Sequence, residues 1–180
     1  MAQTATLYSV AIDLADMDRN VYETLDLRVA RHPSETAEYL LVRILAYCLE
    51  YQEGIALTDG VSSGEQPALV VRDLTGRLTA WIEVGMPDAE RLHRGSTCAG
   101  RVAVYTHRDV RQLLSNLEGQ RIHRSGHIPI RAFDRTIIEE IAAALDRRVG
   151  MSISVSGGEL FIAVSDRSWT LPSVEHRLSS

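Results

Sequence analysis

Residues 78–95, LTAWIEVGMPDAERLHRG, contain the transition that decides the fold of this chain. An apolar run rich in β-forming residues carries a carboxylate, Glu83, near its end, and the glycine, proline and aspartate that follow are typical of a strand end and a helix start. PALVVRDL at 67–74 precedes this run as a hairpin partner, and RVAVYT at 101–106 reads as a second buried strand. A strand, a helix and a strand at this spacing predict a right-handed parallel crossover.

The register of the predicted hairpin indicates which residues lie opposite Glu83 and its neighbours. If Thr75-Gly76 is a two-residue turn, the numbers of paired residues sum to 151, so Trp81 lies opposite Val70 and Glu83 opposite Ala68. Residues two apart share a face of a strand, so we expect Glu83 beside apolar side chains rather than in open water. Three interpretations stay open for it: a catalytic acid, a metal ligand, or a buried charge paired with an arginine.

Changes of hydrophobic period along the chain predict the other elements. They are an opening hairpin of residues 5–16 and 21–31; a helix that begins around His32-Pro33-Ser34-Glu35 with the apolar stripe Leu40, Leu41, Ile44, Leu45, Cys48 and Tyr51; a helix from Asp109 to about Leu117; a helix capped by Asp134 with the stripe Ile137, Ile138, Ile141 and Leu145, ending at Gly150; and a hairpin of 151–156 and 159–164 joined by Gly157-Gly158. Together they predict one α/β domain over 1–180, with a mixed β-sheet that carries hairpins and one parallel βαβ crossover and with helices packed around it.

Composition places the chain among ordinary globular proteins, with 45% hydrophobic and 24% charged residues in a length of 180. No apolar run is long enough to span a membrane, and the N-terminus lacks a basic segment followed by an apolar one. We therefore expect a cytoplasmic protein with no membrane partner. Cys48 and Cys98 form no disulfide framework and no metal-ligand spacing.

The charge is unevenly distributed. The net charge of -5 argues against a general polyanion binder, but residues 101–135 contain seven arginines and three acidic residues, which leaves -9 for the remainder. This basic region could hold a phosphate-bearing ligand such as nucleic acid, or it could be a solvated face. All 19 basic residues are arginine, and a guanidinium cannot serve as a deprotonated base.

Three stretches resemble the YaeQ family: ATLYSVAIDLADMDRNVYE at 5–23, ARHPSET at 30–36 and WIEVGMPDAERLHRG at 81–95. The resemblance covers nearly the whole chain and implies a variant of the PD-(D/E)xK nuclease-like fold. In the nuclease pattern, an acid on the first strand of a hairpin, an E-x-K on the second and often a glutamate from the first helix converge on Mg²⁺, which activates water for phosphodiester cleavage.

Carried over by this resemblance, Glu83 matches the glutamate of the E-x-K, and Glu35 or Glu38 matches the helix acid. Two positions depart from the pattern: Ala68 stands where an aspartate is expected, and Gly85 stands where a lysine is expected. The cleft that the resemblance implies is therefore a degenerate one.

Arginines of the following helix could replace the missing lysine. Arg91 and Arg94 lie about one turn apart, and an arginine can hold a phosphate bidentately. The catalytic version of the hypothesis is Mg²⁺-dependent phosphodiester cleavage with Glu83 and Glu35 on the metal and Arg91 on the phosphate. Its alternative is that Arg91 only neutralises a buried Glu83.

Arg31, His32 and Ser34 could contribute polar ligand-binding groups near the same cleft, or they could form the start of the first helix, with His32 or Ser34 as its cap. His123 and His127 have the spacing of a zinc pair, but the glycine and proline around them indicate a loop, which argues against a metal site.

The sequence therefore leaves three functions open. The first is a nuclease-like cleft that binds nucleic acid or another phosphate ligand. The second is a non-enzymatic interaction or regulatory module linked to transcription or another nucleic-acid process. The third is an enzyme acting on a small phosphorylated metabolite.

Overall fold

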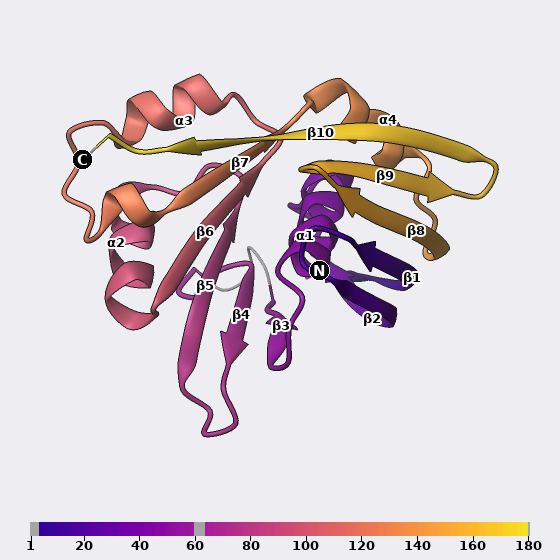
Figure 1. The fold of residues 1–180 in the computed structure, drawn as a ribbon, viewed down its shortest axis with the longest axis horizontal. Helices are drawn as coiled ribbons and strands as arrows, with labels where there is room; N and C mark the ends of the chain where they lie inside the picture. Colours follow the sequence, from indigo (N-terminus) through magenta and orange to yellow (C-terminus); the bar gives the residue numbers. More distant parts are fainter. Residues whose placement is uncertain (1–3, 60–63, 180) are drawn as a thin grey trace.

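The computed structural model describes residues 4–59 and 64–179, and over these ranges a mixed ten-stranded sheet curls into a nearly closed layer around helix α1 (Figure 1). The strand order is β2-β1-β8-β9-β10-β7-β6-β5-β4-β3. The strands are β1 (Thr6–Asp16), β2 (Val21–Arg31), β3 (Ile55–Leu57), β4 (Leu69–Arg72), β5 (Leu78–Val84), β6 (Arg101–Thr106), β7 (Pro129–Phe133), β8 (Arg148–Ser156), β9 (Glu159–Val164) and β10 (Arg167–Arg177). The helices are α1 (Ala37–Leu49), α2 (Ala89–Cys98), α3 (Val110–Leu117) and α4 (Arg135–Ala143), with a short 3-10 turn η2 (Ser125–His127).

Helix α1 forms the centre of the main core. Its residues Leu40 to Ala46 are all at most 1% exposed, so the helix is enclosed on every side rather than along one stripe. A helix that is apolar all round belongs in an interior. The curled sheet supplies that interior, and α4 packs against α1 and β10.

A second core lies on the outer face of β5, β6 and β7, under α2 and α3. Side chains alternate along β5: Ile82 and Val84 belong to the core around α1, whereas Trp81 belongs to the outer core with Leu92 of α2. The same alternation directs Glu83 towards α2. The sheet is thus filled on both faces in this half of the molecule.

In the half formed by β2, β1, β8 and β9, the outward side chains of the described residues are mostly exposed. Leu7, Ala11 and Asp13 of β1 and Arg28 of β2 are examples. Figure 1 shows α2 and α3 gathered on the other half of the sheet.

The parallel part of the sheet is larger than expected. β5 pairs with β6 and β6 with β7, both in parallel, with α2 and α3 in the two connections, and β1 also pairs in parallel with β8. The predicted crossover, β5-α2-β6, is confirmed, and a second one, β6-α3-β7, was not predicted. β3, β7 and β10 were also not predicted. β7 pairs with strands distant in the chain, whereas β3 pairs with β4 and β10 forms a hairpin with β9 in which Arg167 pairs with Val164.

The hairpin predictions are confirmed in their strands and corrected at one turn. Gly157 and Gly158 have φ of +60° and +77° and join β8 to β9 as expected. The second hairpin pairs Trp81 with Val70, but its register shifts after Val71 and Arg72 pairs with Leu78. The prediction of a two-residue turn at Thr75-Gly76 is wrong. The Asp73 carboxylate accepts hydrogen bonds from the backbone N–H groups of Thr75 and Arg77, and these bonds stabilise a longer turn.

Two helix bounds also differ from prediction. The first helix begins at Ala37, with the Thr36 hydroxyl accepting the backbone N–H of Tyr39, so neither His32 nor Ser34 caps it. The last helix ends at Ala143, and Gly150 lies inside β8. None of the helices in the described ranges is long and apolar enough to cross a membrane.

Candidate functional site

Glu83 is a buried carboxylate held by two donors. The Trp81 indole Nε1 donates to its Oε1 at 2.8 Å, and Arg91 donates from Nε to Oε1 at 3.1 Å and from Nη2 to Oε2 at 3.4 Å. The Glu83 side chain is 4% exposed and that of Arg91 is 28% exposed. Both Glu83 oxygens therefore accept from groups of this chain, and the buried ion pair proposed for Glu83 and Arg91 is present.

Burial raises the pKa of Glu83, and the Arg91 guanidinium only partly opposes that effect. The indole N–H of Trp81 acts in the same direction as Arg91, while the Asp88 carboxylate raises the Glu83 pKa further. Glu83 is thus a desolvated carboxylate, and among the described residues its ion-pair partner is Arg91.

Arg91 is fully engaged by the body of the protein. Besides Glu83, its Nη1 donates to the carbonyl of Gly64 at 2.8 Å and its Nη2 to the carbonyl of Gln66 at 2.7 Å. Its Nε, Nη1 and Nη2 all donate within the molecule, so a phosphate could take its bidentate face only by displacing the loop or Glu83.

Two glycines fix this arrangement. A Cβ on Gly95 of α2 would lie 2.6 Å from the Trp81 ring, so the missing side chain lets the helix lie directly on the indole. Gly85, where the nuclease-like resemblance predicts a lysine, has φ of +92°, and a Cβ there would meet the Tyr39 ring at 3.4 Å. A lysine at this position would be strained in its backbone, which gives a physical reason for the departure at Gly85.

Glu35 is held by a different arginine on the other side of the sheet. Arg43 of α1 donates from Nη1 to Glu35 at 3.1 Å and to the carbonyl of Ala30 at 3.2 Å, and from Nη2 to the carbonyl of Thr58 at 2.9 Å. The side chains of both Arg43 and Glu35 are almost completely buried. Since Glu83 points to α2 and Arg43 lies in the core around α1, the two predicted metal ligands approach from opposite faces of the sheet.

Tyr39 connects the two ion pairs. Burial raises its pKa to about 12, and Arg43, Glu35, Glu83 and Arg91 all act on its hydroxyl. The ring lies against Gly85 at the end of β5. Tyr39 therefore lies within electrostatic reach of both ion pairs.

The predicted ligand-binding residues lie at the start of α1 and on α2. Arg31 donates from Nε to the backbone carbonyl of Glu35 at 2.9 Å, and the His32 Nδ1 lies 2.7 Å from the Ser34 hydroxyl. These groups stabilise the turn before α1. Arg94 points to Glu90 on the exposed face of α2 at 3.4 Å, so it does not reach Glu83.

Two polar groups were missed by the sequence analysis. Glu50, at the end of α1, accepts two hydrogen bonds from Arg101 and one from the buried Tyr105 hydroxyl. His107 directly follows β6 and is 7% exposed, and its buried Nδ1 has no hydrogen-bond partner in the described residues. A polar residue just after a buried strand is the signal that could have identified His107.

A hydrolytic Mg²⁺ site fits these residues poorly. Mg²⁺ requires converging oxygens with free lone pairs, whereas Glu83 already accepts from an arginine and an indole and Glu35 from another arginine. Within residues 4–59 and 64–179, no group of three or more His, Cys, Asp or Glu side chains could hold a metal ion.

The basic region divides into paired and unpaired arginines. Arg101, Arg131 and Arg135 each form an ion pair with a glutamate. Arg101 and Arg135 are nevertheless exposed. The other four arginines are also exposed, and among the described residues no carboxylate forms an ion pair with them; they are Arg108, Arg111, Arg121 and Arg124. They lie along one stretch of the chain, from the end of β6 through α3 to η2.

Comparison with known proteins gives a consistent family likeness. A family model described as YaeQ protein matches residues 1–172. The chain is 27% identical to the protein named "Uncharacterized protein YaeQ" of Escherichia coli K12 over 96% of this chain and all of that protein. A Salmonella typhi protein of the same name is also 27% identical, with 91% of each chain covered.

Solved structures agree with the sequence relatives. The crystal structure of YaeQ protein from Pseudomonas syringae has a TM-score of 0.86 at 30% identity, with 95% of each chain covered. That from Xanthomonas axonopodis pv. citri has a TM-score of 0.87 at 28% identity, covering 98% of this chain and all of the other.

Proposed function

The chain belongs to the YaeQ family, and from the distribution of its charged side chains we propose that it binds nucleic acid through phosphate contacts and does not cleave it. The carrying observation is the contrast between arginines that are paired with a buried carboxylate and exposed arginines that are not. Arg43, Arg91 and Arg101 each neutralise a buried carboxylate, whereas the exposed arginines between β6 and η2 form no ion pair with any residue that the structure describes.

We define the basic layer as Arg108, Arg111 and Arg121, which lie after β6, on α3 and in the loop that follows it. Exposed guanidinium groups attract phosphates without reading sequence, because the contact is to the nucleic-acid backbone. A surface of this kind supports affinity at low salt and only weak base preference. It also explains how an acidic chain could bind a polyanion, since the surplus positive charge is local.

Cleavage of the bound nucleic acid is the less favoured alternative to this proposal. The hypothesis that Glu83 and Glu35 hold Mg²⁺ while Arg91 holds the phosphate needs both ion pairs to open. Titration of Mg²⁺ and Mn²⁺ into the protein and into Glu83→Gln tests it directly. We expect no binding that depends on Glu83; millimolar or tighter binding that the substitution abolishes would restore the hydrolytic interpretation.

The binding proposal is tested by fluorescence anisotropy with labelled single-stranded and double-stranded oligonucleotides over a series of salt concentrations. The test variant is the triple substitution of the basic layer to glutamine. The matched control replaces three exposed arginines on the opposite half of the sheet and removes the same charge; these are Arg28, Arg147 and Arg148.

We expect binding to weaken steeply with salt, and the log–log slope to fall by roughly 2–3 in the test variant, at about 0.7–0.9 per lost phosphate contact. The control should keep most of the slope. Equal losses in the two triple variants would indicate a general charge effect, and salt-insensitive binding would favour the alternative of a protein-interaction module with apolar contacts. Either result overturns the proposal.

A further inference from the structure

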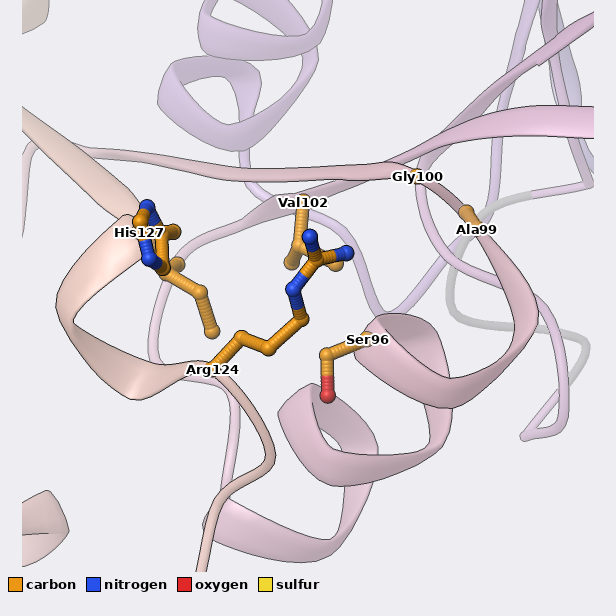
Figure 2. Close-up of a pocket in the computed structure, with 7 residues that line it drawn as sticks. Ser96, Ala99, Gly100, Val102, Arg124 and His127 are labelled. Carbon is orange, nitrogen blue, oxygen red and sulfur yellow. The ribbon is translucent and has the colours of Figure 1, made fainter.

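A small pocket next to the basic layer combines a cation with an apolar floor. It has a volume of about 120 Å³ and lies between the end of α2, the start of β6 and η2. Val102 and Ile128 contribute apolar groups, and Ser96, Arg124 and His127 contribute polar ones. Figure 2 shows the Arg124 side chain extending from its loop between His127 and Ser96.

Among the residues that the structure describes, the charge in this pocket has no counterion. None of the pocket's described lining residues is acidic, and Arg124 forms no ion pair with any residue in the described ranges. The Ser96 hydroxyl donates to the carbonyl of His93 at 2.9 Å, which leaves its own lone pairs for a donor. The open hydrogen-bonding capacity is therefore mainly that of guanidinium and imidazole N–H groups, which suits an anion.

Arg124 has an unusual backbone conformation. Its φ of 54° and ψ of 36° place it in the left-handed region, which few residues other than glycine adopt. Arg124 immediately precedes η2, and its carbonyl accepts the backbone N–H of His127 at 2.9 Å. The conformation thus ties Arg124 and His127 to one turn of chain.

The volume of the pocket limits the size of the ligand that it can hold. Pockets for drug-sized molecules usually measure about 300–1,000 Å³, so this one is too small for a nucleotide base and sugar. It is large enough for a few waters or one oxyanion. A tetrahedral phosphate suits a planar guanidinium, which can donate two parallel hydrogen bonds to it.

We propose that this pocket binds the terminal phosphate monoester of a nucleic-acid strand, with Arg124 as the bidentate donor and His127 as a second donor. The inference rests on the proposed function and deepens it: the basic layer holds internal phosphates, and the pocket holds the strand end. A monoester fits because only one oxygen of the phosphate continues into the strand, which can leave through the mouth of the pocket.

The test compares oligonucleotides of one sequence that carry a 5′-phosphate, a 3′-phosphate or hydroxyl groups at both ends. We expect one phosphorylated end to bind on the order of 10- to 100-fold more tightly than the hydroxyl form, as for one charge-assisted contact. Arg124→Gln should remove this preference and leave binding of the hydroxyl form nearly unchanged. Arg121→Gln, from the same loop, is the matched control and should retain the preference.

A second measurement separates this inference from the proposed function. Inorganic phosphate is titrated into the full chain while the imidazole NMR signals of His127 are followed, with Arg124→Gln and Arg121→Gln alongside. A shift that only Arg124→Gln abolishes supports a phosphate site in the pocket. If no oligonucleotide binds in the same series, the proposed function fails, and the assignment of the ligand as a strand end fails with it. Oligonucleotide binding with no preference for a terminal phosphate, and no Arg124-dependent shift, overturns the pocket and leaves the basic layer standing.

Discussion

Replacing Arg91 by methionine should destabilise the protein by about 3 kcal/mol, because it leaves Glu83 buried with only the Trp81 indole as a donor. Losing one partner of a buried pair typically costs about 3–5 kcal/mol, and the lower end applies here because the Arg91 side chain is 28% exposed. For a chain of this length, such a loss corresponds to a decrease in Tm of roughly 6–12 °C. Methionine keeps most of the aliphatic volume that packs on α2.

A second substitution, at Glu83, tests whether the loss of stability comes from the unpaired carboxylate. Glu83→Gln removes the charge that Arg91 neutralises, so the double variant Glu83→Gln/Arg91→Met should be more stable than Arg91→Met alone. The effect also depends on pH. Burial already raises the Glu83 pKa above 4.5, and loss of Arg91 raises it further, so the folded state takes up a proton more readily than the unfolded state. The deficit of Arg91→Met should therefore grow as pH rises above the raised pKa that Glu83 has in the folded wild type, and be smallest in acid.

Urea unfolding of the wild type, both single variants and the double variant, at an acidic and a slightly alkaline pH, measures all of these quantities. The m-values should stay equal, so that the change in midpoint reports stability. A cost below about 1 kcal/mol for Arg91→Met, together with no rescue in the double variant, would show that Glu83 is not a buried charge that depends on Arg91. The hypothesis of a metal or catalytic role for Glu83 would then regain weight.

Three further outcomes follow from the same structure. Tyr105→Phe should cost about 1.5–3 kcal/mol in urea unfolding, because the buried Glu50 carboxylate loses a hydrogen-bond donor; a cost near zero would mean that Arg101 alone suffices. Gly95→Ala should cost about 1–3 kcal/mol and change Trp81 fluorescence, since the new Cβ would overlap the indole; unchanged fluorescence would contradict this close packing. Burial lowers the pKa of His107 below 6.5, with further effects from nearby arginines and glutamates. The stability present above pH 6.5 should therefore be lost as pH falls. His107→Leu should flatten this dependence of stability on pH. The flanking charged groups are Arg108, Glu38, Arg135 and Glu139.

Much of the fold could be predicted from local sequence patterns. The two glycines at 157 and 158 specify a tight turn, and the runs on either side of them pair as expected. The apolar stripe of α1 likewise identifies its helix, because helix formation depends on near neighbours. Full burial of α1 was less apparent, since it results from a sheet assembled from both ends of the chain.

The candidate site was predicted in part. The sequence indicates that Glu83 is buried beside Trp81 and that Arg91 could neutralise it, because the strand alternation and the next helix place these residues near each other. It could not indicate that Arg43 neutralises Glu35 inside the core, or that Glu50 meets Arg101 and Tyr105, because those contacts join elements far apart in the chain.

The sequence by itself determined the family, the main hairpins and the predicted crossover. It also determined the charge of Glu83 and the surplus of arginine between residues 101 and 135. These are local patterns, or counts of residue types, and folding does not alter them. Only the tertiary structure decided which arginines neutralise buried carboxylates and which do not, and it alone formed the pocket around Arg124. The physical reason is that ion pairing and desolvation depend on distances of a few ångströms between elements that the curled sheet brings together.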